Sequence, residues 1–179
     1  MRVIPTHPER VMPLSLYQAS VPVLIRNLNN LRAVLEKGAV HAEAKKLDPT
    51  TLLNFRLFPD MFPLSRQVQI ACDMTKGCPA RLAGVEAPKY EDNEASFADL
   101  YARIEKTVAY VKTFKPEQID GNEERAIVLK TPRGDLNFTG LTYLQGFVLP
   151  NAYFHATTAY NILRHNGVEI GKQDYLGRS

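Results

Sequence analysis

Hydrophobic residues recur at helical spacing near the start of the chain. Leu24, Leu28, Leu31 and Leu35 are three or four positions apart, which places them on one face of a helix. Apolar residues on either side continue the pattern, so we predict a long helix over residues 14–42. Its leucine face is the side expected to pack against the rest of the protein.

Three further segments show the same periodicity. We predict a second helix over residues 63–84, ending at Gly84, and a third over residues 96–115. A last helix is predicted over residues 140–164, with a kink at Pro150. The inner faces of the second and third helices are formed by Leu64, Val68, Ala71, Thr75, Leu82, Phe97, Leu100, Ile104, Val108 and Val111.

The connecting segments differ in character. Residues 50–62 carry apolar side chains interrupted by prolines, which indicates a short helical turn and then a partly buried connection. Residues 85–93 form a polar linker. Residues 125–130 alternate apolar and polar positions, and turn-forming residues separate them from 136–138, which predicts a β-hairpin.

These elements predict an all-α fold, an antiparallel four-helix bundle with a small β-hairpin before the last helix. The short links favour alternating helix directions, although the hairpin insertion would allow a crossover. The prolines near the start of the chain indicate a flexible N-terminal arm over residues 1–12. Residues 13–179 are expected to form a single helical-bundle domain.

Composition narrows the classes of function. Hydrophobic residues make up 45% of the 179 residues and charged residues 23%, which is typical of a globular domain. The net charge is +3 without a basic stripe, so we expect no nucleic-acid binding. No apolar run reaches the roughly 18 residues of a membrane span, and no signal peptide is recognisable, so we expect a cytoplasmic protein without membrane contact.

The two cysteines fit that expectation. Cys72 and Cys78 are six positions apart, which turns their thiols well away from each other on one helix. A disulfide between them is therefore not expected, and two separate cysteines suit a reducing compartment. We interpret both as small buried hydrophobic residues.

His155 is the leading candidate for chemistry, because the common catalytic motifs are absent from the chain. On the last helix it lies at the edge of the apolar face, near Asn151 and Thr158. One interpretation is a histidine at the core edge, bonded to one polar partner. The other is a metal ligand or general base in a pocket, since neutral imidazole suits both roles. We predict that His155 points into the bundle.

Other polar residues have simpler interpretations. His41, near the end of the first helix, fits a histidine favoured by the helix dipole. Arg56 and Asp60 lie among apolar residues, which predicts that both are buried and paired, or that Asp60 caps the second helix. Asp73 falls opposite the apolar face of its helix and is expected in solvent.

The spacing of four residues near the C-terminus resembles the last helix of the DinB-like (DinB/YfiT-like) superfamily. They are Asn151, His155, Arg164 and Gly167. The stretches LSLYQASVPV, RLFPDMFPLSRQVQIACD and RLAGVEAP, with residues 155–177, are similar to one branch of that superfamily, known only as a domain of unknown function. The resemblance covers nearly all of the chain after Met12 and implies a four-helix bundle.

The resemblance also implies a divalent metal, zinc or nickel, held by three histidines. One comes from the second helix and two from the last. Only His155 matches this pattern, because Asn151 stands at the other position on the last helix. The second helix offers no histidine, only Gln67, Gln69, Cys72 and Asp73. His41, Asp60 and Asp73 are candidates to complete a site with His155.

Two functions remain open. The first is a non-catalytic homodimer that binds a small molecule or a partner, with a pocket at His155, Asn151, Thr158 and Gln69. The second is a divalent-metal-dependent transferase or hydrolase-like enzyme with its site around His155.

The apolar surface of the second helix separately favours a homodimer. Ile70 and Met74 widen the apolar surface of the second helix beyond one packing seam. Alternatively, the connection over 50–62 or the C-terminal tail covers them within one chain.

Overall fold

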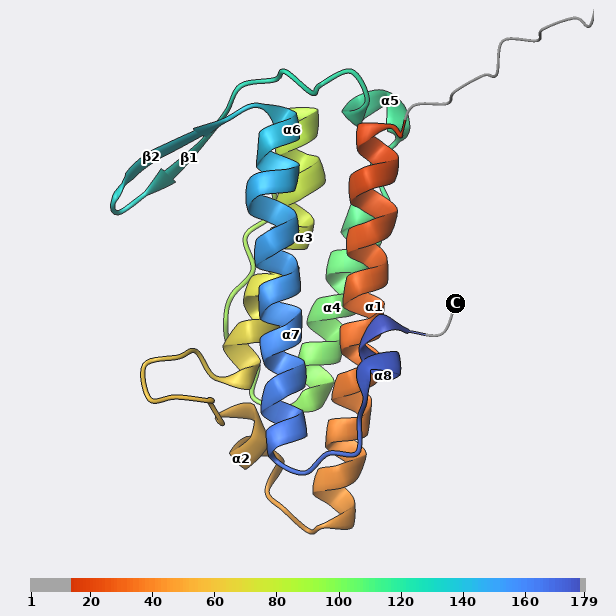
Figure 1. The fold of residues 1–179 in the computed structure, drawn as a ribbon, viewed down its shortest axis with the longest axis vertical. Helices are drawn as coiled ribbons and strands as arrows, with labels where there is room; N and C mark the ends of the chain where they lie inside the picture. Colours follow the sequence, from red (N-terminus) through yellow and green to blue (C-terminus); the bar gives the residue numbers. More distant parts are fainter. Residues whose placement is uncertain (1–13, 178–179) are drawn as a thin grey trace, which may run out of the picture.

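The computed structural model describes residues 14–177 and is mostly helical. Its long helices α1 (Leu16–Ala44), α3 (Leu64–Ala83), α4 (Phe97–Val111) and α7 (Leu149–His165) lie side by side (Figure 1). α1 and α3 each contact the other three, whereas α4 and α7 lie on opposite sides of that pair. The prediction of a helical protein with one hairpin before its last helix is confirmed.

Short elements connect and extend these helices. α2 (Pro49–Leu53) follows α1, and α5 (Pro116–Ile119) follows α4. The predicted last helix consists of α6 (Gly140–Tyr143), the π-helical turn η1 (Leu144–Val148) and α7 in succession. The irregularity therefore lies in η1, just before the proline at which a kink was predicted. The tail, which shows little pattern in the sequence, contains α8 (Lys172–Leu176).

The helix ends follow local sequence signals. Ser15 begins α1 with a capping box, in which its side chain accepts a hydrogen bond from the Gln18 backbone. Ser96 begins α4 and accepts from the backbone of Asp99, at the predicted spacing. Gly84 ends α3 with φ of 74°, a left-handed conformation that glycine adopts without a Cβ penalty. These boundaries are set by a few residues each, which is why they are readable in the sequence.

The hairpin consists of β1 (Ile127–Thr131) and β2 (Gly134–Phe138), paired antiparallel. Leu129 lies opposite Leu136, and cross-strand partners share a face of the ribbon. Leu129 and Phe138 pack against the helical core. Figure 1 shows the hairpin projecting from one end of the bundle. In β1 the face of Ile127 and Leu129 is covered, whereas Val128 and Lys130 on the other face are exposed.

The core consists of two clusters of buried side chains, one toward each end of the helices. The first cluster lies at the end of the bundle where α1 ends, and the second lies where α1 begins. Ile25, half-buried on α1, packs against both. Among the residues of the first are Leu28, Leu35, Leu64, Val68, Phe97, Leu100, Ala159 and Leu163; among those of the second are Leu16, Leu24, Cys78, Leu82, Val111, Tyr143 and Ala152.

The clusters show that α3 and α4 run in the same direction, which corrects the predicted alternating order. α3 begins with Leu64 in the first cluster and ends with Leu82 in the second. α4 likewise begins with Phe97 and ends with Val111. Residues 85–96, called the strap below, return along the bundle past α3 (Figure 1). Such a segment, when extended, spans about 40 Å, more than the roughly 30 Å of a 20-residue helix.

Two further expectations concern the N-terminal arm and contact with a membrane. The arm predicted over residues 1–12 lies outside the described residues. Within residues 14–177 no helix has the length and apolar character required to cross a membrane.

Candidate functional site

His155 lies inside the bundle, where α7 packs against α3. Only 8% of the residue is exposed, as predicted. Its Nδ1 is 2.7 Å from Oε1 of Gln67, a residue of α3 that is 1% exposed. The amide nitrogen of Gln67 donates to the carbonyl oxygen of Phe62 at 2.9 Å. Gln67 is therefore the polar partner of the only imidazole on the inner face of α7.

The hydrogen bonds fix the chemical state of His155. Because the Gln67 nitrogen already donates to Phe62, its oxygen faces the ring and accepts from Nδ1–H. Burial lowers the pKa of His155, and the positive charge of Arg66 lowers it further. The ring is thus neutral near pH 7, with its proton on Nδ1. Among the described residues Nε2 has no hydrogen-bond partner, and it is not one of the fully buried unpaired atoms.

The remaining members of the predicted pocket make other contacts. Asn151 donates to the carbonyl oxygen of Phe147 at 2.6 Å, and the Thr158 hydroxyl donates to that of Phe154 at 2.8 Å. Both bonds reach back one turn along the same helix. Gln69 is turned away from His155 and donates to Glu94 at 2.8 Å. The structure therefore brings Gln67, rather than these three residues, to His155.

The residues considered as further metal ligands lie in separate places. His41, in the last turn of α1, lines a groove of about 620 Å³ with Gly167 and Glu169. Asp60 is exposed in the loop before α3, and Asp73 binds Arg103 and Lys76. Within residues 14–177 no three histidine, cysteine, aspartate or glutamate side chains come together as a group that could hold a metal ion.

The predicted buried pair of Arg56 and Asp60 is wrong. Both side chains are exposed, and Arg56 donates instead to the carbonyl oxygen of Met61 at 3.2 Å. The neighbouring Leu57, Phe58 and Phe62 are exposed as well. The apolar character of this segment therefore does not reflect burial, and both charged side chains remain accessible to water.

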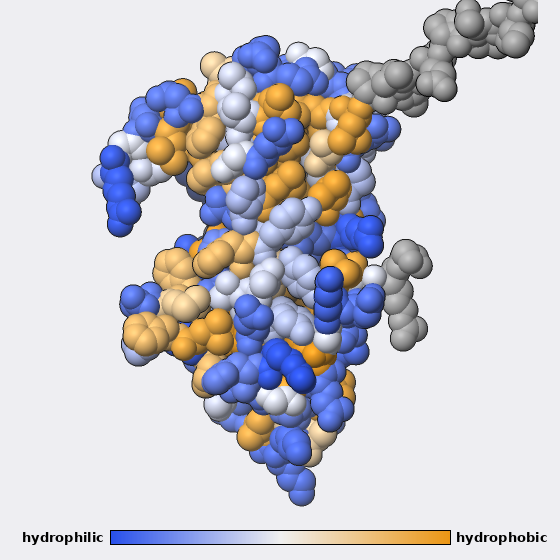
Figure 2. Space-filling view, viewed as in Figure 1, coloured by the Kyte–Doolittle hydropathy of each residue, from blue (hydrophilic) through white to orange (hydrophobic). Residues whose placement is uncertain are grey.

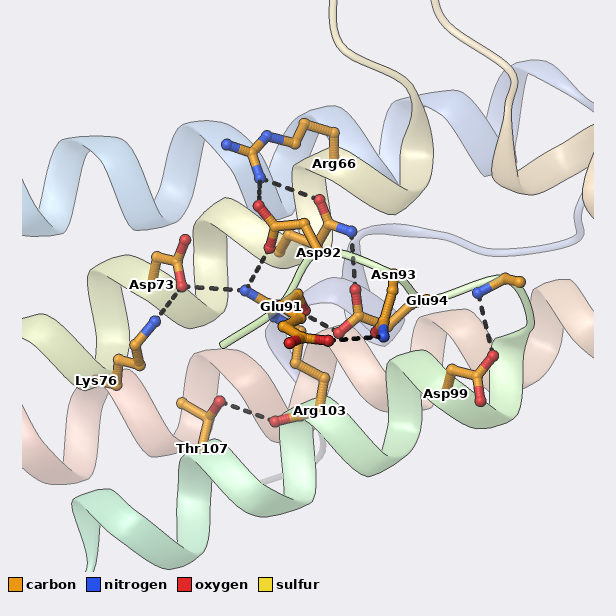
Figure 3. Close-up of polar contacts among 12 residues, drawn as sticks. Arg66, Asp73, Lys76, Glu91, Asp92, Asn93, Glu94, Asp99, Arg103 and Thr107 are labelled. Atoms are coloured by element: carbon orange, nitrogen blue, oxygen red, sulfur yellow. Dashed lines mark hydrogen bonds and ion pairs between the residues drawn. The ribbon is translucent and has the colours of Figure 1, made fainter. Parts of the chain in front are cut away.

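A second polar cluster surrounds Arg103 on α4, between α3 and the strap (Figure 3). Arg103 is 4% exposed. One guanidinium nitrogen lies 3.1 Å from Asp73 and 2.9 Å from Asp92. The second terminal nitrogen lies 2.8 Å from Glu94 and donates to the Glu91 carbonyl oxygen at 3.0 Å. Arg103 therefore joins α3, α4 and the strap through charged hydrogen bonds.

Further contacts widen this cluster. Lys76 pairs with Asp73, and Arg66 pairs with Asp92 (Figure 3). The ring of Tyr90 in the strap lies 4.4 Å from the Lys76 ammonium. Lys106 approaches the same ring to 4.3 Å, a cation–π geometry. The prediction that Asp73 faces open solvent is thus corrected, because the strap covers the side of α3 on which Asp73 lies.

Both cysteines are free and completely buried, as predicted. Burial raises the pKa of the Cys72 and Cys78 thiols to about 12. Thiols with such pKa values stay protonated near neutral pH, so they are weak nucleophiles. Neither cysteine belongs to a candidate catalytic site.

The model of a family described as a domain of unknown function, DUF1993, matches residues 16–176. The chain belongs to the DUF1993 family. It is also similar to a solved structure, that of a DinB family member protein from Shewanella denitrificans, at 44% identity and a TM-score of 0.85. The match covers 92% of this chain and 93% of the other. No curated protein matches the chain.

These findings confirm the resemblance to a DinB-like branch of unknown function, and they allow the implied metal to be tested against this DUF1993 chain. Beside His155 the structure brings one amide, that of Gln67, and the other position of the pattern on the last helix is a second amide, Asn151; each amide is held in a hydrogen bond within the protein. Catalytic zinc sites use three histidine, carboxylate or thiolate ligands, and neutral amides are poor substitutes. The donor set around His155 therefore does not fit a three-histidine metal centre.

Proposed function

We propose that this DUF1993 protein is a non-catalytic helical bundle, with α1, α3, α4 and α7 as its four helices, that acts as a homodimer and binds a small molecule or partner beside His155. The observation that carries the proposal is an exposed apolar surface next to the Gln67–His155 pair. The buried, protonated thiols of Cys72 and Cys78 suit the cytoplasm, where the proposal places the protein.

The apolar surface consists of Leu57, Phe58, Phe62 and Phe154, called the aromatic patch below. Phe58, Phe62 and Phe154 each expose more than half of their surface. Phe62 accepts a hydrogen bond from Gln67, and Phe154 precedes His155, so the patch flanks the pair from the loop and from α7. Figure 2 shows hydrophobic side chains on this loop and a hollow between it and the hairpin. Exposed aromatic side chains in such numbers are typical of contact surfaces.

Ile70 and Met74 are the residues whose positions in the sequence favour a homodimer. They contribute less to this surface than the aromatic patch does. Both are half-buried, and Met74 packs against the second core cluster. Met74 also lines a small cavity of about 240 Å³ together with Leu129 of the hairpin. The hairpin thus covers part of the apolar surface of α3, and the aromatic patch is the stronger basis for the dimer.

Sedimentation of the full chain at micromolar concentrations tests the proposal. We expect a species of twice the 20.1 kDa chain mass that dissociates on dilution. Phe62→Ser should shift the equilibrium toward monomer, because it removes an exposed ring from the patch. Val40→Ser is the matched control, since Val40 is an exposed apolar residue on α1, outside the patch.

Two results would contradict the proposed dimer. One is a monomer whose mass does not change with concentration. The other is an equal response of the oligomeric state to Phe62→Ser and Val40→Ser, which would mean that the aromatic patch is not the contact surface.

A second candidate function is a divalent-metal-dependent transferase or hydrolase-like enzyme using a site around His155. The observation that favours it is the Nε2 atom of His155, which has no partner among the described residues and retains the lone pair that binds metals. Dialysis against zinc or nickel and then buffer decides it. One bound metal per chain that is lost in His155→Ala would favour the enzyme.

A further inference from the structure

The Gln67–His155 hydrogen bond connects two long helices inside the bundle. Gln67 comes from α3 and His155 from α7, and both side chains are more than nine-tenths buried. The amide of Gln67 uses both ends, since its nitrogen donates to Phe62 and its oxygen accepts from the imidazole. Buried polar groups are costly unless they are paired, so each side chain needs the other.

The same two helices are the ones from which the resemblance expects metal ligands. The DinB-like pattern has one histidine on the second long helix and two on the last. Here α3 is the second long helix, and the side chain that it directs at His155 is Gln67. The other position on α7, one turn before His155, is Asn151, whose amide bonds to its own helix. Each of the two helices therefore carries an amide that forms a hydrogen bond within the protein.

We infer that Gln67 occupies the position of the missing third histidine, and that its hydrogen bond to His155 joins α3 to α7 where a metal ion joins the corresponding helices of a three-histidine relative. A metal ion and a hydrogen bond both satisfy a buried imidazole and hold its ring in one orientation. The amide does so without a charge. The inference concerns the interior of one chain, so it stands or falls independently of the proposed homodimer.

The tautomer of His155 in the full-length wild-type protein gives the first test. Nitrogen-15 NMR of the imidazole should show a proton held on Nδ1 and an unprotonated Nε2 near neutral pH. Gln67→Leu should abolish that preference or expose the Nδ1 proton to rapid exchange. Gln69→Leu is the matched control, because Gln69 is also buried on α3 but bonds to Glu94 in the strap. A proton on Nε2 in the wild type, or equal effects of the two variants, would overturn the inference.

Restoring the ligands gives the second test. Gln67→His combined with Asn151→His should complete a three-imidazole set with His155. This double variant should bind zinc at least about 100-fold more tightly than the wild type, because one imidazole becomes a three-ligand site. Adding His155→Ala should abolish the gain. The control is a double variant with Gln69→His and Asn151→His. Its new imidazole on α3 lies on the side of the strap, so its affinity for zinc should stay low.

Each result of the zinc-binding experiment has a distinct meaning. Tight stoichiometric zinc binding by the wild type would overturn the inference, since Gln67 would then not replace the metal. A folded double variant that gains no zinc affinity would show that Gln67 does not occupy the ligand position. If the double variant does not fold, the tautomer of His155 in the wild type and in the two leucine variants decides the question.

Discussion

His155 shows how its surroundings determine the state of a single side chain. An exposed histidine titrates near pH 6.5, whereas burial and the charge of Arg66 lower the pKa of His155. The hydrogen bond to Gln67 engages Nδ1 and leaves Nε2 as the unprotonated atom. A neutral, oriented imidazole is suited to accept a hydrogen bond from a bound molecule.

The lowered pKa predicts a specific pH dependence of stability. Below about pH 6.5 the unfolded chain takes up a proton at His155, while the folded protein resists protonation until lower pH. The unfolded state then binds more protons, so the free energy of unfolding falls as the pH falls. We expect this loss to be smaller in His155→Gln. Urea unfolding at a series of values between roughly pH 8 and 5 measures it.

The exposed His165, in the last turn of α7, provides the control. The change in slope caused by His155→Gln is compared with that caused by His165→Gln, and it should be the larger of the two. If His155→Gln and the wild type lose stability in parallel over this range, the folded protein protonates His155 as readily as the unfolded chain does, and the assignment of a buried neutral ring is wrong.

Sequence reasoning at the scale of residues succeeded for His155 and failed for Arg56 and Asp60. Helical periodicity places His155 at the core edge, because its position depends only on α7. Arg56 and Asp60 lie in a loop without periodicity, where apolar neighbours do not indicate burial. The sequence does not indicate a role for Gln67, since that role depends on the packing of α3 against α7.

The strap is the element whose course the sequence did not reveal. Its composition indicates a polar linker, but two of its acidic residues, Asp92 and Glu94, form ion pairs with Arg103. Because α3 and α4 are parallel, the chain must return along the bundle, and Arg103 fixes it there. The helices themselves were predicted well, since their caps and apolar faces are local. The short α5 and α8 have too few residues for a periodic pattern.

Substitution of Arg103 tests the importance of this contact. Arg103→Met leaves Asp73, Asp92 and Glu94 without their shared cation, and removing one partner of a buried pair costs about 3–5 kcal/mol. Arg32→Met is the control, because Arg32 forms partly exposed pairs with Glu36 and Glu105.

The control should cost less than about 1 kcal/mol, as surface ion pairs do. Chemical denaturation measures both losses of free energy, and hydrogen exchange of the strap amides shows whether the segment detaches. Equal losses in the two variants would mean that Arg103 does not hold the strap more firmly than a surface ion pair would.

At the scale of the whole molecule, two core clusters have to act together. α1, α3, α4 and α7 pass through both clusters or end in them, and Ile25 packs against each. Helices that span both ends of a bundle couple the packing at one end to that at the other. We therefore expect residues 13–179 to unfold as one domain.

Thermal unfolding followed by two probes tests this expectation. Far-ultraviolet circular dichroism reports the helices, and near-ultraviolet dichroism reports buried tyrosines such as Tyr143 in the second cluster. For a single cooperative unit both signals should have the same midpoint. A separate, earlier transition of the tyrosine signal would show that the second cluster unfolds independently.

The sequence alone determined the helical class, the extents of the long helices, the hairpin and the inward position of His155. Each of these depends on periodicity, caps or turns within one segment. Only the tertiary structure decided the parallel course of α3 and α4, the ion pairs of Arg103 with the strap and the pairing of Gln67 with His155. These depend on contacts between residues far apart in the chain, whose free energies local patterns do not encode.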